Sequence, residues 1–481
     1  MMRKLLEQVT FADLEFRRQG IELDPVLRQI KAFLDDRPEL VALVQGDLDR
    51  GLKNPATGRD GLGASRVLRS FVLWRIKDWS YRELRERIAD GYTLRLFAGF
   101  DSREVPKYQA FQRAFCRLQP GTVRALNDAV VLGAVMRKLE DGRALRVDTT
   151  VVETDIHYPT DSHLLWDCVR VITRTVEHIA DDLPEAVDAF PDRRRRAKRR
   201  YGEIARMKGR RGEHQRAFRR RYRDLLAVTG EVVAEARPVA ERALSAPPAN
   251  LLAAVRVDAA VKQLLHYADL AERVIAQTRR RVFLGEQVSA AEKIYSIFET
   301  HTDLIVRGKA RKPSEFGHKV FLAESKKGLI TEYRVLQGNP VDSTHVGSSL
   351  DQHKKIFGSV PKLYAGDRGF DDPRARRLAE DAGVSTLCIP QRGGKLCAER
   401  AATQKSRAFK KGQAFRCGIE GTISVLFRGR GMKRCLLEGE QRFEVFVGAS
   451  VLASNLLRIG TLLERRAAKR AKRTPPLRQA A

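Results

Sequence analysis

The sequence of 481 residues is poor in several features, and each shortage excludes a class of protein. It has six cysteines and no Cys-x-x-Cys spacing, so we expect neither a zinc site nor a disulfide framework. No stretch approaches the roughly 18 consecutive apolar residues of a membrane span, and the N-terminus lacks the apolar core of a secretory signal. These absences predict a cytoplasmic protein with reduced thiols.

Acidic residues are also scarce relative to basic ones. The chain has 90 lysines and arginines against 60 acids, which gives a formal net charge of +30. Such an excess indicates a polyanionic partner, of which nucleic acid is the commonest. Ribosomal and membrane-surface proteins share this charge, but they are usually shorter and do not carry isolated acids within strands.

One such acid is Asp148, in the β-branched stretch Leu145–Val152. Period-2 alternation places Leu145, Val147, Thr149 and Val151 on one face of the predicted strand and Asp148 on the other. A carboxylate in so apolar a strand is costly unless a cation satisfies it. An edge-strand aspartate that faces water is the alternative interpretation.

Two more acids occur in similar settings downstream. Asp367 ends a short apolar strand and is flanked by Gly366 and Gly369, and Glu420 lies on a helix predicted to begin at Ile419. Asp303 is an alternative second acid, although no strand precedes it. Three converging carboxylates are hard oxygen ligands that suit Mg²⁺ or Mn²⁺, and two such ions support displacement at phosphorus.

Before this region the chain is predicted to be helical. Apolar spacing predicts a helix over Ala64–Lys77, and Ser80 with Glu83 forms a capping-box pattern for the next helix, to Ala89. A third predicted helix begins at Phe111. Helices of this length with basic faces are typical of a helix-turn-helix-like DNA-binding module, and a plain helical packing domain is equally consistent with the spacing.

A long basic helical stretch, residues 163–299, interrupts the α/β pattern. Its arginines recur three or four residues apart, which would present several of them to one phosphate track. The predicted phosphate contacts in this insertion are Arg193, Arg196, Arg199, Arg219 and Arg221. Tyr158, just before it, and Trp166, within it, are candidates either for stacking on a flipped base or for ordinary core or surface packing.

After the insertion, alternating hydrophobicity predicts an α/β region. Strands over 317–323 and 330–336 form a hairpin at Lys327-Gly328, and two further strands flank a helix with Pro373 in its first turn. Residues 391–412 lack a clear period and are predicted to be a basic loop. A last helix is expected over 443–463, followed by a basic disordered tail. The predicted fold class is a mixed α/β sheet domain, interrupted by a helical insertion and preceded by an all-α domain.

Three of these segments resemble the catalytic blocks of bacterial insertion-sequence DDE transposases. They are Val147-Asp148-Thr-Thr, Ala365-Gly-Asp367-Arg-Gly-Phe and Arg416-x-x-x-Glu420, and the stretch from Val151 to Ser162 is similar to the ISNCY-type branch. The resemblance implies a ribonuclease-H-like catalytic domain. The implied boundaries are a DNA-binding domain at 1–140, a catalytic domain at 141–162 and 300–464, the insertion at 163–299 and the tail at 465–481.

The resemblance also implies roles. Asp148, Asp367 and Glu420 would bind the Mg²⁺ or Mn²⁺ ions that drive cleavage at the element's ends and strand transfer into target DNA. The implied partners are double-stranded DNA, both terminal inverted repeats and target, and a second copy of the chain in a dimer on that DNA. The implied cellular location is a bacterial cytoplasm, in association with the nucleoid.

The chain departs from many relatives, which have Tyr and Lys where Gln413 and Phe427 stand here. Nearby bases are candidates for the phosphate contacts instead. They are Arg368, Arg416, Arg428, Arg430, Lys433 and Arg434. Two other functions fit the same residues: a metal-dependent nuclease or resolvase without strand transfer, and a non-catalytic DNA-binding derivative of such an enzyme.

Overall fold

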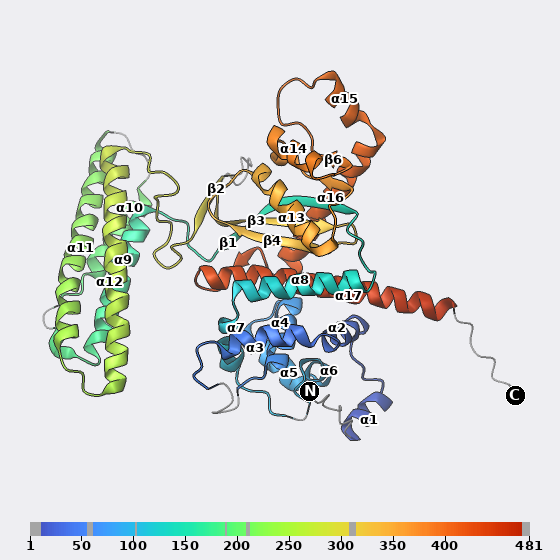
Figure 1. The fold of residues 1–481 in the computed structure, drawn as a ribbon. Coiled ribbons are helices and arrows are strands. Elements are labelled where there is room, and N and C mark those ends of the chain that lie inside the picture. Colours follow the sequence, from blue (N-terminus) through green and yellow to red (C-terminus); the bar gives the residue numbers. More distant parts are fainter. Residues whose placement is uncertain are drawn as a thin grey trace. The chain divides into compact units, whose positions relative to one another are not determined.

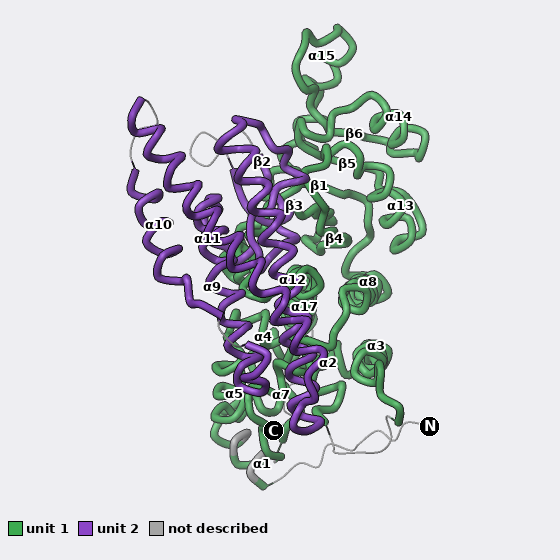
Figure 2. Tube along the Cα trace, turned by 90° about the vertical axis from the view of Figure 1, so that its left-hand side faces the viewer, with its two compact units in different colours: residues 1–153, 319–481 green, residues 154–318 purple. Residues whose placement is uncertain are grey.

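The protein is a mixed α/β structure in a computed structural model that describes residues 11–54, 61–101, 103–187, 190–207, 212–306 and 314–473. The chain divides into two compact units (Figure 2). Unit 1 contains residues 1–153 and 319–481, and unit 2 contains residues 154–318. The chain therefore leaves unit 1 in the middle of the sequence and returns to it.

Unit 1 begins with helices whose ends follow from local sequence. Pro25, Pro38 and Pro120 each occupy the first turn of a helix, where the missing N–H costs nothing. The predicted cap at Ser80 is confirmed, because its hydroxyl accepts a hydrogen bond from the Glu83 N–H at 3.2 Å. The helices are α1 (Phe11–Arg18), α2 (Pro25–Asp35), α3 (Pro38–Asp49), α4 (Ala64–Lys77), α5 (Tyr81–Asp90), α6 (Tyr92–Ala98), α7 (Tyr108–Arg117) and α8 (Pro120–Met136).

The sheet has the order β4-β3-β1-β5-β6, with β7 beside β1. β4 is antiparallel to β3, and β5 is parallel to both β1 and β6. The predicted hairpin between β3 and β4 is confirmed, and Gly328 in its turn has a φ of +82°, which favours glycine. The strands are β1 (Ala144–Thr154), β3 (Ser314–Ser325), β4 (Ile330–Leu336), β5 (Leu363–Ala365), β6 (Thr386–Cys388) and β7 (Arg434–Cys435).

The two faces of this sheet carry different helices. Leu145 and Val147 of β1 join a core with residues of α13 (Val346–Phe357) and α14 (Pro373–Asp381), as the alternation predicts. Val152 of β1 and Val320 and Leu322 of β3 belong to the opposite core, to which α16 (Arg407–Gly429) and α17 (Glu440–Arg473) contribute. The short helices η3 (Asp342–His345), η4 (Arg368–Phe370) and α15 (Ala398–Lys405) complete unit 1.

Helix α17 is the central element of the second core. It contacts β4 of the sheet and also α2, α4 and α8 of the N-terminal region (Figure 1). Its buried Asn455 bonds the N–H and the carbonyl of Ile330, each at 2.8 Å, and donates to Asn127 of α8 at 2.7 Å. Although α17 is long and apolar enough to cross a membrane, 72% of its apolar window is buried within the protein, as expected of a core helix.

One core joins the N-terminal helices to the sheet across the predicted boundary at residue 140. One hydrophobic cluster extends from Leu23 through the N-terminal helices to β3, β4 and α17. The N-terminal segment is helical as predicted, yet it belongs to the same compact unit as the sheet. The reason is that α17 packs its apolar side chains both on the N-terminal helices and on the sheet.

Unit 2 confirms the predicted helical insertion. Helices α9, α11 and α12 run side by side around their own core, and the first residues of β3 pair with the short strand β2 (Figure 1). The unit is somewhat longer than predicted, 154–318 instead of 163–299. Its elements are α9 (Asp161–Ala180), η1 (Pro184–Val187), α10 (Arg194–Arg206), α11 (Gly212–Ser245), α12 (Leu251–Arg279), η2 (Arg280–Leu284) and β2 (Asp303–Val306).

Two predictions for the C-terminal third are wrong. The expected loop at 391–412 contains α15 and the first turns of α16. The last helix continues to Arg473 instead of ending at Leu463, because residues 464–473 are Glu, Arg, Ala and Lys, which all favour helix. The remainder of the predicted tail, 474–481, lies outside the described residues.

Candidate active site

The three predicted acids meet at one side chain, the guanidinium of Arg416. Its Nη2 lies 2.9 Å from Asp148 Oδ2 and 3.7 Å from Asp367 Oδ2, and its Nη1 lies 2.8 Å from Glu420 Oε1. Residues from two strands and one helix, far apart in sequence, thus converge as predicted. What the sequence did not predict is that an arginine joins them.

The sheet register explains why the two aspartates are neighbours. β1 and β5 are parallel, and Arg146 is paired with Ala365. Asp148 comes two residues after Arg146, and Asp367 comes two residues after Ala365. Equivalent positions of a parallel pair point to the same face of the sheet. Asp367 turns out of the strand as the cap of η4, where its Oδ1 accepts the Gly369 N–H at 2.8 Å.

Asp148 has the cationic partner that its apolar setting required. It is only 7% exposed, and besides Arg416 its carboxylate accepts the Thr149 N–H at 2.8 Å. Burial works to lower the pKa of Arg416, but the charges of Asp148, Asp367 and Glu420 outweigh it and raise that pKa. The guanidinium therefore stays protonated among the three acids.

A second ion pair holds α16 against the sheet beside these acids. Arg146, two residues before Asp148, donates to both oxygens of Glu324 at 2.7 and 2.9 Å and to the Phe415 carbonyl at 2.8 Å. Glu324 is 1% exposed and also accepts the Thr422 hydroxyl of α16 at 2.8 Å. This network, from β1 and β3 to α16, fixes the helix that carries Arg416 and Glu420.

Gln413 connects α16 to the sheet. Its side-chain amide donates to the carbonyls of Cys388 at 2.6 Å and Gly366 at 3.3 Å, at the ends of β6 and β5. It thereby ties the first half of α16 to the residue that precedes Asp367. Gln413 therefore positions α16 at the end of the parallel strands.

The donor chemistry of the cluster suits a hard divalent cation, because all three acids offer carboxylate oxygens. Among the described residues, however, no group of three or more His, Cys, Asp or Glu side chains is close enough to hold a metal ion directly. The cause lies in the cluster itself, where the Arg416 guanidinium stands between the carboxylates. The Arg416 Nε is buried and has no hydrogen-bond partner within the described chain.

Not all of the predicted phosphate contacts near the acids are exposed. Arg368, Arg428 and Lys433 have exposed side chains. Arg434 is also exposed, and it donates to the buried carboxylate of Glu153 at 3.0 Å. Arg430 donates to the carbonyls of Ile76 and Gly429, and burial lowers its pKa. Arg430 is therefore bonded within unit 1, and Arg434 combines an ion pair with a half-exposed side chain. A phosphate contact stays a prediction for both.

Two neighbouring arginines of this set should behave differently when replaced. Arg428→Ala is expected to weaken DNA binding about uniformly across sequences and to reduce the salt dependence by roughly one phosphate contact. Arg430→Ala should instead lower the free energy of unfolding by about 1–3 kcal/mol, because the carbonyls of Ile76 and Gly429 lose their donor. Fluorescence anisotropy at several salt concentrations and urea unfolding separate the two effects. Equal salt slopes for wild type and Arg428→Ala would contradict the first assignment.

The arginines of the insertion divide in the same way. Arg193 pairs with Glu231 at 2.8 Å and Glu235 at 2.5 Å, Arg196 with Asp224, and Arg221 with Glu203 at 3.0 Å. These acids lie on neighbouring helices, so the charge run is largely neutralised between helices. Arg193, Arg196 and Arg221 thus each have a carboxylate partner within unit 2, and their phosphate contacts stay a prediction. Arg199 and Arg219 are exposed and form no ion pair with the part of unit 2 that is described.

The alternative second acid, Asp303, has another partner. It lies at the start of β2, in unit 2, with its Oδ2 3.1 Å from His318 Nδ1. His318 Nε2 lies 2.7 Å from His301 Nδ1, and His301 Nε2 lies 2.6 Å from Glu299, so the four side chains form a hydrogen-bonded chain. Asp367, not Asp303, is the aspartate that shares Arg416 with Asp148.

The arrangement brings together three carboxylates and one arginine at the edge of a sheet, in a strongly basic chain. Comparison with known protein families, with characterised proteins and with solved structures finds no match for this chain.

Proposed function

We propose that this protein is a metal-dependent DNA transposase of the DDE type, with Asp148, Asp367 and Glu420 as its catalytic acids. The observation that carries the proposal is their convergence on Arg416 from three distant segments. A net charge of +30 supplies the affinity for a polyanionic substrate.

The sheet supports a ribonuclease-H-like assignment for the catalytic domain. The first acid lies on the central strand of the order β4-β3-β1-β5-β6, and the second follows the parallel neighbour of that strand. The third acid is on α16, which packs on the same face. All three carboxylates thus lie within reach of one guanidinium on the same face of the sheet.

The balance of charge explains what the chain's residues would do. Without Arg416 the three carboxylates carry three formal negative charges, which attract divalent cations. Bound there, Mg²⁺ or Mn²⁺ would activate an attacking oxygen and stabilise the leaving one in an in-line displacement at phosphorus. Asp148, Asp367 and Glu420 would hold the cations, and Arg416, released from the carboxylates, would pair with a phosphate of the bound strand.

The test uses a labelled duplex that carries the DNA flanking the coding sequence, incubated with the full chain in Mg²⁺ or in EDTA. We expect nicking at the end junction in Mg²⁺ and none in EDTA. Equal cleavage in both would contradict a metal-dependent reaction. Binding without cleavage in either Mg²⁺ or Mn²⁺ would favour a non-catalytic DNA-binding protein.

A second substrate distinguishes a transposase from a nuclease or resolvase with the same acids. In this substrate the labelled strand already ends in the 3′-hydroxyl that cleavage produces, so only the joining step remains. A transposase joins this end to an unlabelled duplex, which increases the length of the labelled strand. A nuclease leaves the strand unjoined and cuts only the uncleaved duplex.

A further inference from the structure

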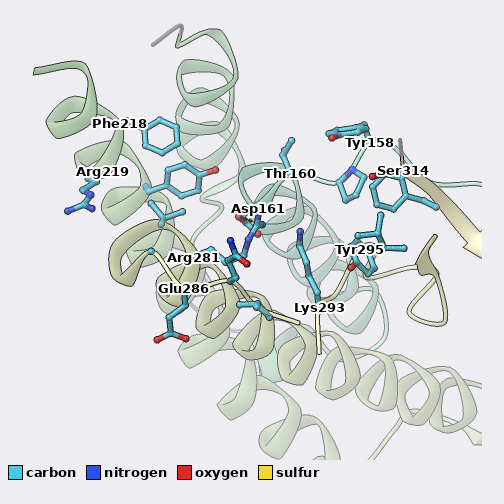
Figure 3. A pocket seen from close by; sticks show the side chains of 18 of the residues that line it. Tyr158, Thr160, Asp161, Phe218, Arg219, Arg281, Glu286, Lys293, Tyr295 and Ser314 are labelled. Carbon is cyan, nitrogen blue, oxygen red and sulfur yellow. Dashed lines mark hydrogen bonds and ion pairs between the residues drawn. The ribbon is translucent and has the colours of Figure 1, made fainter. Parts of the chain in front are cut away.

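Unit 2 contains a cavity of about 790 Å³ that has no part in the cluster around Arg416. It is formed by residues that precede α9, by one side of α11 and by the segment after α12 (Figure 3). Its volume falls within the range of ligand sites for small molecules, about 300–1,000 Å³. All its lining residues belong to unit 2.

Aromatic rings line two sides of this cavity. On α11, Phe218 and Tyr222 lie with their ring centroids 4.8 Å apart. Opposite them, Phe316 contacts both Tyr158 and Tyr295, at centroid distances of 5.7 and 5.5 Å. Tyr158 is 77% exposed, which is unusual for so large a ring and leaves its face accessible to a planar ligand.

The charges of the cavity favour an anion. Its acids are already paired: Asp161 accepts from Arg281 at 2.6 Å, and Glu286 accepts from Arg280 at 2.6 Å. The lining bases Lys293 and Arg219, in contrast, form no ion pair with any described carboxylate. The cavity therefore presents two cations outside any ion pair, and the charge of Asp161 acts in addition on Lys293.

Lys293 is the base best placed to bind a ligand. It stands between Arg281 and Tyr295, with the two aromatic groups on either side, whereas Arg219 lies at the rim (Figure 3). Its ammonium is 5.3 Å from the Tyr295 ring centroid. Burial, followed by the charge of Arg281, lowers the pKa of Lys293, so a bound anion would stabilise its charged form.

We propose that this cavity binds a nucleotide whose base is unpaired, with its phosphate at Lys293 and its base against the exposed ring of Tyr158. Stacking on an aromatic ring accepts any base, and an ammonium accepts any phosphate, so the site does not read sequence. The same chemistry is offered by a free nucleotide and by an unpaired nucleotide within DNA. The inference does not depend on the proposed cleavage reaction, because it uses none of the three acids.

The test measures binding to the full chain without divalent cations, so that failure of catalysis cannot affect it. One arm is calorimetric titration with deoxyadenosine 5′-monophosphate. The other arm compares, by fluorescence anisotropy, a short duplex with one bulged adenosine and the same duplex fully paired, at one salt concentration. Binding in the first arm identifies a free nucleotide as a ligand, and a preference for the bulge identifies DNA as the source.

Variants then assign the binding to this cavity. Lys293→Ala should lower the affinity for the ligand that binds, the nucleotide or the bulged duplex, about tenfold, since a hydrogen bond to a charged group is lost. Tyr158→Ala should also lower this affinity about tenfold, because the base loses its stacking partner. Lys198→Ala is the matched control, because it removes the same charge from an exposed position of unit 2 outside the cavity. Tyr158 is mostly exposed, so its truncation leaves the fold intact even if Lys293→Ala does not.

Two results would overturn the proposal. One is the absence of nucleotide binding together with equal affinity for the bulged and paired duplexes. The other is an equal loss of affinity in Lys293→Ala and Lys198→Ala, which would show that only the general positive charge of unit 2 matters.

Discussion

Asp148→Asn is expected to reduce metal-dependent DNA cleavage about a thousandfold, because a lost metal ligand removes several kcal/mol of transition-state stabilisation. The substitution keeps the size of the side chain and an oxygen that can accept the Thr149 N–H. It removes the negative charge that faces Arg416. The fold should therefore survive while the reaction does not. The measurement is the single-turnover nicking rate of the labelled duplex in Mg²⁺.

Two controls make this result specific. DNA affinity, measured by anisotropy, should not fall, since the variant removes an acid from a basic protein. Asp351→Asn changes the same atoms on an exposed turn of α13 and should cleave at the wild-type rate. Asp367→Ala and Glu420→Gln should lose activity as Asp148→Asn does. Cleavage that persists in Asp367→Ala would mean that another residue supplies the second carboxylate.

Glu324→Ala should lower the free energy of unfolding of unit 1 by about 3–5 kcal/mol, which is the usual cost of breaking a buried ion pair from one side. Glu324 is 1% exposed, and its removal leaves the Arg146 guanidinium without its carboxylate and the Thr422 hydroxyl without its acceptor. Urea unfolding followed by tryptophan fluorescence measures the loss. In a Trp166→Phe background the signal comes only from Trp74 and Trp79, both in unit 1.

The matched control is Glu22→Ala, which breaks an ion pair with Arg28 whose side chains are 60% and 53% exposed. Such a pair contributes at most about 1 kcal/mol. The double variant Arg146→Met with Glu324→Leu should recover much of the loss, because it leaves no unpaired charge. A cost for Glu324→Ala no larger than that for Glu22→Ala would show that the buried network does not hold α16 in place.

Local patterns predicted the elements of this site well. The alternation of β1 placed Asp148 on the opposite face from Leu145 and Val147, and the structure confirms it. The cap at Ser80 and the hairpin at Gly328 follow from side chains that act within a few residues. Such features are predictable because the cause and the effect lie in the same short stretch.

The remaining features depend on residues that are distant in sequence. The start of α16 was missed because one of its contact positions is Gly412, where an added Cβ would lie 2.2 Å from the Cys388 sulfur. A glycine required by close packing is invisible to hydrophobic periodicity. The arginines of unit 2 looked unpaired because their acids are on other helices. Likewise, nothing local to Arg416 shows that three carboxylates surround it.

The position of unit 2 in the chain has a consequence for the folding kinetics. β1 and β3 are adjacent strands, yet the whole of unit 2 separates the end of one from the unit 1 part of the other. As a flexible chain, this segment would impose a loop-closure entropy on their pairing and so slow the formation of the sheet. If unit 2 collapses first around its own core, it brings these two strands together. Early folding of the insertion would then speed the pairing of β3 with β1, the strand that carries Asp148.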